Sequence, residues 1–164
     1  MALQYIVDGY NVIKSSEDGS LSAGTLQQQR ERLIALIAEM KPHGSPRNGI
    51  AVVFDSSPDA ILPDSAVDRY IKDGVAVIFS AGRTADDKIT ELAKNYKNPG
   101  EIIVVTDDRG IRRQLGGIGV KFMSADEFSG KLARPSRPYK KQGKTDSDSE
   151  DEINKEFKDY WLKK

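Results

Sequence analysis

Short apolar runs recur along the chain, and each is rich in residues that favour β-strands. They are Leu3–Val7, Ile50–Phe54, Val75–Phe79, Ile102–Val105 and the shorter Val120–Met123. The longer runs do not alternate between apolar and polar positions. Such near-continuous hydrophobicity is typical of a parallel sheet that is covered on both faces. The pattern therefore predicts a mainly parallel β-sheet between two layers of helices.

Amphipathic helical patterns separate these runs. Apolar residues recur at helical spacing within Leu26–Met40 and again within Ile89–Tyr96. Ser124 and Glu127 have the spacing of a capping box, which predicts a final helix after the last strand. Strand and helix thus alternate, as in a doubly wound α/β domain that ends near residue 131.

The chain changes character after residue 131. Residues 132–152 contain prolines, a basic segment and then an acidic, serine-containing segment, which is the composition of a flexible charged linker. Residues 153–164 carry one apolar helical face, formed by Ile153, Phe157, Tyr160 and Trp161. We therefore expect a domain over 1–131, a linker over 132–152 and a short amphipathic helix over 153–164. Because so short a helix is marginal alone, it is expected to dock on the domain, a second copy or a partner.

Aspartates stand at the ends of three predicted strands. Asp8, Asp55 and Asp107 follow the first, second and fourth runs. In open parallel sheets, ligands bind outside the carboxyl ends of the strands where strand order reverses, so these acids are expected to converge. Asp86 opens the helix of Ile89–Tyr96 and is in register with its buried face, whereas Asp87 is expected to face water.

Carboxylates at such a site need compensation. A close pair repels by about 1 kcal/mol in water and about 4 kcal/mol at an intermediate dielectric. The chain has no cysteine and one histidine, His43, so any metal must be held by oxygen, as Mg²⁺ or Mn²⁺ prefers. Such an ion activates water and stabilises the leaving oxygen, which favours phosphodiester hydrolysis. Asn11 is expected to orient Asp8 or to contact a phosphate or a metal-bound water. Arg83 is expected either to hold the scissile phosphate or to be an ordinary surface arginine.

Plainer roles are available for several residues. An aspartate at a strand end is often a helix cap or turn former, and Asp108 is expected to cap the helix that runs to Leu115. Gly9 is expected to permit a backbone bend between Asp8 and Asn11. Gly116–Gly119 precedes a strand, so it is expected to stop a helix and form a turn rather than cradle a phosphate. His43 is expected in a loop.

Four strings carry a family resemblance, in chain order: Tyr5–Asn11, Val52–Asp55, Thr84–Asp87 and Val105–Asp107. Spread over about the first 130 residues, they resemble the NYN branch of the PIN-like nucleases and, within it, the bacterial YacP-like family. The resemblance implies a PIN-like three-layer sandwich and a divalent-metal-dependent endoribonuclease. Threonine stands at position 106, where the pattern more often has serine, and it keeps the hydroxyl. The acids and metal ligands that the resemblance implies are Asp8, Asp55, Asp86 and Asp107, with Asn11 beside them.

Other function classes fit less well. A haloacid-dehalogenase-type phosphatase needs a second acid two residues after Asp8, where Tyr10 stands, and phosphate-loop and dinucleotide fingerprints are absent. The alternative that stays open is a PIN-like module that binds RNA or the ribosome without cutting it.

Charge and the first residues bear on partners and location. Residues 1–130 carry 15 Lys and Arg against 18 Asp and Glu, which is unusual for a protein that seeks a polyanion unaided. We therefore expect RNA as the substrate, presented by a larger assembly such as the ribosome. The first apolar run is too short for a signal peptide or membrane span, so a cytoplasmic protein without a membrane partner is expected.

Overall fold

The computed structural model describes residues 2–16, 19–55, 69–80 and 83–133. The predicted terminal helix and nearly all of the predicted linker lie outside these residues. The described part contains one six-stranded sheet of order β3-β4-β2-β1-β5-β6, in which every neighbouring pair is parallel except β3 with β4. The strands are β1 (Gln4–Asp8), β2 (Gly49–Phe54), β3 (Arg69–Lys72), β4 (Val75–Phe79), β5 (Ile102–Val105) and β6 (Lys121–Met123).

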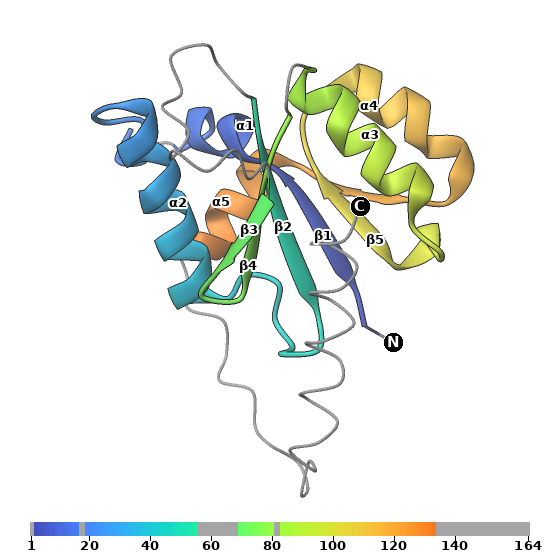
Figure 1. Ribbon diagram of the computed structural model, residues 1–164, viewed down its shortest axis with the longest axis horizontal. Helices are drawn as coiled ribbons and strands as arrows, with labels where there is room; N and C mark the ends of the chain where they lie inside the picture. Colours follow the sequence, from blue (N-terminus) through green and yellow to red (C-terminus); the bar gives the residue numbers. More distant parts are fainter. Residues whose placement is uncertain (1, 17–18, 56–68, 81–82, 134–164) are drawn as a thin grey trace, which may run out of the picture.

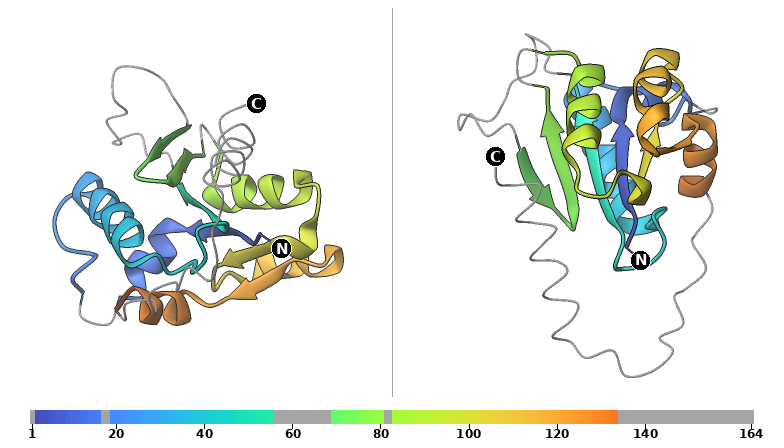
Figure 2. Two further views of the ribbon diagram at one scale, coloured as in Figure 1. Left: turned by 90° about the horizontal axis from the view of Figure 1, so that it is seen from below. Right: turned by 90° about the vertical axis from the view of Figure 1, so that its right-hand side faces the viewer.

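Helices cover both faces of this sheet, as Figures 1 and 2 show. One layer contains α1, α2 and α5, and the other contains α3 and α4. The predicted three-layer α/β sandwich is therefore confirmed. The α-helices are α1 (Gly9–Lys14), α2 (Leu26–Met40), α3 (Ala85–Asn95), α4 (Arg109–Leu115) and α5 (Ala125–Ala133), and the short 3-10 helices are η1 (Pro99–Glu101) and η2 (Gly116–Ile118).

Burial explains the apolar runs of the sequence. All residues of β2 and β4 are buried, and successive side chains of each strand enter opposite cores. Val52 and Phe54 pack with α1, α2 and α5, whereas Ala51 and Val53 pack with α3 and α4. A strand of this kind has no polar face, so its sequence cannot alternate.

Strand order reverses beside β1. This strand lies at the centre and pairs with β2 on one side and with β5 on the other, both in parallel. Its register places Asp8 opposite Val53, one residue before the end of β2. The carboxyl ends of β1, β2 and β5 therefore meet at one edge of the sheet, at the top of Figure 1.

Side-chain caps fix where the helices begin. The hydroxyl of Thr84 accepts from the backbone N–H of Asp87 at 3.1 Å and starts α3. Ser124 accepts from Glu127 in the same way at 3.1 Å, ahead of α5, and Asp108 accepts from Ile111 at 2.9 Å at α4. The starts predicted at Ser124 and Asp108 are thus confirmed. The turn at Gly116–Gly119 is confirmed too, since Gly119 has φ of 93°.

The segment after β1 differs from the prediction. Residues 9–14 form the helix α1 rather than a tight bend, and Gly9 has no positive φ. Glycine is needed for space instead, because a Cβ atom built there would lie 2.6 Å from Cδ1 of Phe54. The close contact of α1 with β2 brings Tyr10 onto the Phe54 ring, and buried Arg30 of α2 donates to the Tyr10 hydroxyl at 3.0 Å.

The edge strand β3 is absent from the predicted strands. Three of its four residues are only partly buried and the fourth, Lys72, is exposed, so they form no apolar run. The signal lies in the turn, because Asp73 and Gly74 have φ of 51° and 81°. Asp-Gly is the dipeptide that a two-residue β-hairpin favours.

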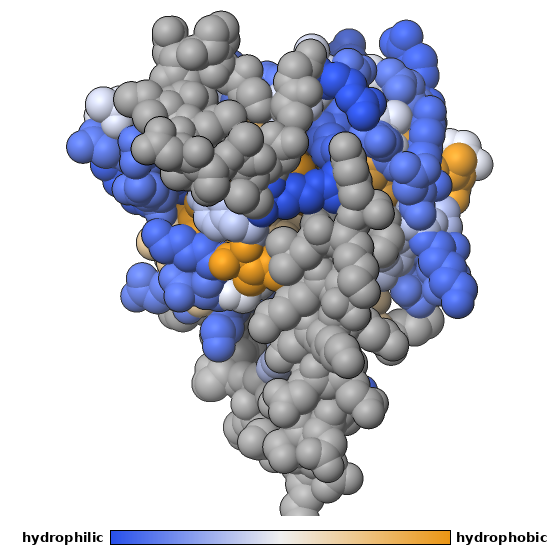
Figure 3. Space-filling model, in the orientation of Figure 1, coloured by the Kyte–Doolittle hydropathy of each residue, from blue (hydrophilic) through white to orange (hydrophobic). Residues whose placement is uncertain are grey.

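The described surface is mainly polar. On the face shown in Figure 3 the apolar areas are small and separate. Among the described residues, the large hydrophobic side chains that stay exposed are Leu26 and Ile118. No helix in this part of the chain is long and apolar enough to cross a membrane.

Gly9→Ala tests the packing of α1 on β2. In an open helical position alanine is favoured over glycine by about 1 kcal/mol. At Gly9 we expect the clash with Phe54 to outweigh this gain and to lower the free energy of unfolding by about 1–3 kcal/mol, measured by urea denaturation.

The matched control is Gly130→Ala in α5, where an added Cβ meets no atom within 4 Å. This variant is expected to be as stable as the parent or more stable. Equal effects of the two substitutions would contradict the assigned role of Gly9.

Candidate active site

Acidic side chains gather at the carboxyl edge of the sheet. Asp8 is the last residue of β1, Asp55 follows β2 directly, and Asp86 is the second residue of α3. Asp108 joins them as the cap of α4. Each of Asp55, Asp86 and Asp108 raises the pKa of Asp8 through its charge, so the four carboxylates act on one another.

Asp8 is the most perturbed of these groups. Burial is the largest cause and the charge of Asp86 the next, and together with the weaker effects of Asp55 and Asp108 they raise the pKa of Asp8 from 3.8 to about 6. The backbone N–H of Asn11 acts in the opposite direction. Asp8 therefore sits where a negative charge is costly unless a positive charge compensates it.

Asp86 is shifted for the same reasons. Burial raises the pKa of its carboxyl group first, followed by the charges of Asp108 and Asp55 and by a hydrogen bond with the Asp108 side chain. The orientation agrees with the helical pattern, since Asp86 is partly buried and Asp87 is exposed. The end of β1 and the start of α3 thus place Asp8 and Asp86 at the same site.

Asp55 ties the sheet to α3. Its Oδ1 atom accepts a hydrogen bond of 2.7 Å from the backbone N–H of Ala85, the first residue of the helix. This N–H has no partner inside the helix, so the bond satisfies it and adds a negative charge at the positive end of α3. The same bond fixes Asp86, one residue later, near the end of β2.

Asn11 and Asp107 link α1 to the loop after β5. The backbone N–H of Asp107 donates to Oδ1 of Asn11 at 3.0 Å. The Asp107 carboxylate accepts from the N–H of Ala125, at the start of α5, at 3.2 Å. Asn11 and the backbone of Asp107 thus lie beside the site. The charge that acts on both Asp8 and Asp86 from this loop is that of Asp108, and Asp107 is not among the causes of either pKa shift.

Thr106 connects two members of the cluster. Its side chain is fully buried, and its hydroxyl lies 3.5 Å from Oδ2 of Asp8 and accepts from the N–H of Asp108 at 3.1 Å. A hydroxyl can donate and accept at once, so this residue bridges β1 and the loop after β5. That hydroxyl is the group that threonine shares with serine.

The structure gives Arg83 a local partner. Its Nη2 atom lies 3.1 Å from Oε2 of Glu91 in α3, and Lys88 lies 3.4 Å from the same oxygen. The Arg83 side chain is 53% exposed, so this ion pair is weak and can open. Arg83 stands two residues before α3, but among the described residues it forms no ion pair with any of the four acids.

The donor set fits a hard, hydrated cation. It consists of oxygen ligands whose negative charges raise the pKa values of Asp8 and Asp86. Among the described residues no three acidic or histidine side chains converge closely enough to enclose an ion. Mg²⁺ is usually bound by one or two carboxylates and keeps several waters, which suits this open arrangement. Asp8 and Asp86 are the side chains best placed to hold it.

The raised pKa of Asp8 gives a stability prediction. The group ionises near pH 3.8 in the unfolded chain and near pH 6 in the fold, so its contribution to stability falls as the pH rises between these values and stays low above them. In EDTA at pH 7.5, Asp8→Asn is therefore expected to raise the free energy of unfolding by about 1–3 kcal/mol. The gain should vanish near pH 4. Urea denaturation at both values measures it, and a less stable variant at pH 7.5 would speak against the repulsion.

Comparisons with known proteins agree with this architecture. The model of the YacP-like NYN domain matches residues 5–164. Rae1 (YacP) from Bacillus subtilis has a similar solved structure, with a TM-score of 0.61 and 30% identity over 81% of this chain and 74% of that chain. A mutant form of Rae1 gives a TM-score of 0.60 and 22% identity over 98% and 93%. No curated protein matches. The chain belongs to the YacP-like NYN family, which is of the nuclease type and related to RNA.

Proposed function

We propose that this protein is an endoribonuclease that hydrolyses RNA phosphodiester bonds with the aid of Mg²⁺ or Mn²⁺. The observation that carries the proposal is the mutual effect of Asp8, Asp55, Asp86 and Asp108 at the carboxyl edge of the sheet. Such repulsion costs stability, and a divalent cation relieves it. Membership of a nuclease-type, RNA-related family supports the same reaction class.

Each residue has a definite task in this proposal. Asp8 and Asp86 hold the cation, and Asp55 keeps α3 in place through the N–H of Ala85. Thr106 orients Asp8, and Asn11 holds the loop after β5 through the N–H of Asp107. When bound, the ion supplies an activated water and stabilises the leaving oxygen of the phosphodiester. Arg83, once released from Glu91, holds the phosphate with its planar donors.

Cleavage of labelled RNA tests the proposal. Products are expected with Mg²⁺ or Mn²⁺ and none in EDTA. Asp8→Asn and Asp86→Asn should each reduce the rate by at least about a hundredfold, because each removes a charge that holds the ion. Asp87→Asn is the control: this neighbour of Asp86 is exposed, and its charge acts on Asp86 less strongly than the charges of Asp108 and Asp55, so the rate should fall far less. Full activity in EDTA, or in either of the first two variants, rules out the catalytic assignment.

Asp107 and Asp108 give a sharper comparison within the same assay. Both side chains cap helices, and asparagine caps about as well as aspartate, so neither Asp→Asn change should unfold the protein. Because the Asp108 charge acts on Asp8 and Asp86, Asp108→Asn is expected to lower the cleavage rate more than Asp107→Asn. The opposite order would favour Asp107, the acid that the family resemblance implies.

The binding-only alternative has a distinct outcome. A module without catalysis retains RNA in EDTA and yields no products in any ion. One observation favours this alternative: among the described residues, no three acidic or histidine side chains enclose a metal.

We further propose that a larger assembly, such as the ribosome, presents the RNA. Residues 1–130 are net negative, and Arg83 is paired with Glu91. Electrostatic attraction of a polyanion therefore needs other cations, and the basic segment after residue 131 is one source.

Truncation after Ala133 tests this delivery. The cut keeps Leu132, which is 3% exposed and part of the core. The full chain is expected to cleave messenger RNA on ribosomes faster than naked RNA, and the truncated chain should lose this preference. If the truncated protein cuts both substrates as the full chain does, the delivery proposal fails while the nuclease assignment stands.

A further inference from the structure

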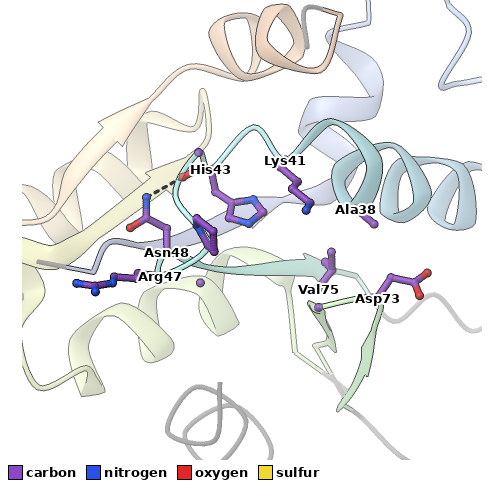
Figure 4. A pocket seen from close by; sticks show the side chains of 11 residues that line it. Ala38, Lys41, His43, Arg47, Asn48, Asp73 and Val75 are labelled. Carbon is purple, nitrogen blue, oxygen red and sulfur yellow. Dashed lines mark hydrogen bonds between the residues drawn. The ribbon is translucent and has the colours of Figure 1, made fainter. Parts of the chain in front are cut away.

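A pocket lies at the amino ends of the strands, at the opposite end of the sheet from the acids. It has a volume of about 230 Å³ and is formed by the loop between α2 and β2 and by the turn between β3 and β4. Gly49 and Val75, the first residues of β2 and β4, line it, so it opens at the amino ends of strands whose carboxyl ends carry the acids. We call it the amino-end pocket. Figure 4 shows Lys41 and His43 between Arg47 at one end and Asp73 at the other.

His43 offers an unused polar atom in this pocket. Its Nδ1 atom is buried and has no hydrogen-bond partner among the described residues. The ring packs edge to face on Tyr5, with centroids 6.4 Å apart. Burial and, less strongly, the charge of Lys41 lower the pKa of His43 to about 4, so the imidazole is neutral at pH 7. A buried polar atom left without a partner is costly, and a turn of the ring toward a ligand in the pocket would relieve that cost.

Lys41 occupies a backbone position that suits another residue type. It ends α2 in the left-handed conformation, with φ of 47°, where glycine or asparagine is favoured. Among the described residues, the non-glycine residues with positive φ are Lys41 and Asp73, and both line this pocket. Lysine at this site adds an ammonium group at the expense of backbone conformation. Neither Lys41 nor Arg47 forms an ion pair with a described residue.

The loop of the pocket is already held in place. The Nδ2 atom of Asn48 donates to the carbonyl oxygen of His43 at 2.7 Å, which Figure 4 shows as a dashed line. Its Oδ1 atom accepts from the N–H of Leu3 at 2.8 Å. Asn48 therefore fixes the loop to the segment before β1, so the backbone of the loop needs little ordering when a ligand enters.

The charges of the pocket select the ligand class. Lys41 and Arg47 are cationic, whereas Asp73 and the last carbonyl groups of α2 are negative. A bare polyanion would meet both signs. A nucleotide matches both, because its phosphate is an anion for the two cations and its base carries N–H donors for the carboxylate. The volume lies below the range of about 300–1,000 Å³ for drug-sized sites, so the pocket can take no more than one nucleotide.

We propose that the amino-end pocket binds a single nucleoside monophosphate, either free or as the phosphorylated end of an RNA strand. The site is separate from the acidic cluster, and its occupancy does not require that the cluster cut RNA.

Binding is measured on the full chain in EDTA, so that metal-dependent cleavage plays no part. Adenosine 5′-monophosphate, adenosine and inorganic phosphate are titrated separately, and backbone amide shifts are followed by NMR. We expect saturable shifts for Gly44 and Gly74 with the monophosphate, at affinity at least about tenfold higher than with either fragment. An RNA oligomer with a 5′-phosphate and one with a 5′-hydroxyl separate the two sources. Tighter binding of the phosphorylated oligomer identifies an RNA end, and tighter binding of the monophosphate identifies a free nucleotide.

Lys41→Asn separates ligand binding from folding. Because asparagine tolerates the left-handed conformation, the melting temperature should stay the same or rise. The affinity for the monophosphate should nevertheless fall about tenfold, through loss of one charge-assisted contact. Asp73→Asn keeps a favoured hairpin turn and removes one negative charge, so the phosphate should bind at least as tightly.

Lys72→Gln is the matched control. It removes the same charge from an exposed residue of β3 that does not line the pocket, and the affinity should be unchanged. The proposal is overturned if no probe saturates, if Lys41→Asn binds as well as the parent, or if the shifts arise at Asp8 and Asp86 in place of Gly44 and Gly74.

Discussion

Mutual repulsion between carboxylates is the constraint on which the rest of this structure depends. Asp8, Asp55, Asp86 and Asp108 come from four separate segments, and the fold brings them to one edge of the sheet. In the unfolded chain, their repulsion would keep these carboxylates apart. The burial of two apolar cores, one on each face of the sheet, supplies the free energy that holds the acids together. Their repulsion makes the site electrostatically unfavourable, and the proposed cation would relieve it.

Backbone donors limit this cost. The N–H of Ala85 binds Asp55, and the N–H of Ile111 binds Asp108. Both are N–H groups of a first helical turn, which has no partner inside the helix. Helices α3 and α4 thus point their positive ends toward the acids. Asp8 lacks an equally strong cap, and its pKa is raised to about 6, so it is the carboxylate that the proposed cation would relieve most.

The sequence predicts the layers well because a buried element shows a clear pattern of apolar residues. Strand β2 is apolar at every position, and the helical period correctly separates Asp86 from Asp87. Elements that bury few side chains show no such apolar pattern. Strand β3 is short and half-exposed, and α1 has six residues, too few to show a period. From the sequence, Gly9 at the start of α1 suggests a turn. The structure shows that glycine is needed there because the Phe54 ring lies beside it.

Adjacent aspartates show the limit of sequence reasoning at the site. Asp107 and Asp108 both follow β5, and both have the composition of a cap. What distinguishes them is a residue far along the chain, because the N–H of Ala125 takes the Asp107 carboxylate and leaves Asp108 near Asp86. No local pattern encodes that choice. The pairing of Asp55 with Ala85, 30 residues away, is equally hidden.

The two ends of the sheet also divide the chemistry. The proposed cation site lies at the carboxyl edge, and the proposed nucleotide pocket, with Lys41 and Arg47, lies at the amino edge.

The ionisation of Asp8 tests the proposed cation site most directly, and carbon-13 NMR of its carboxyl group measures it as a function of pH. Without metal, the midpoint is expected near pH 6, and with saturating Mg²⁺ it should fall toward or below the ordinary 3.8. A midpoint near 3.8 without metal, or one that Mg²⁺ does not move, would contradict the claim that these carboxylates form a cation site.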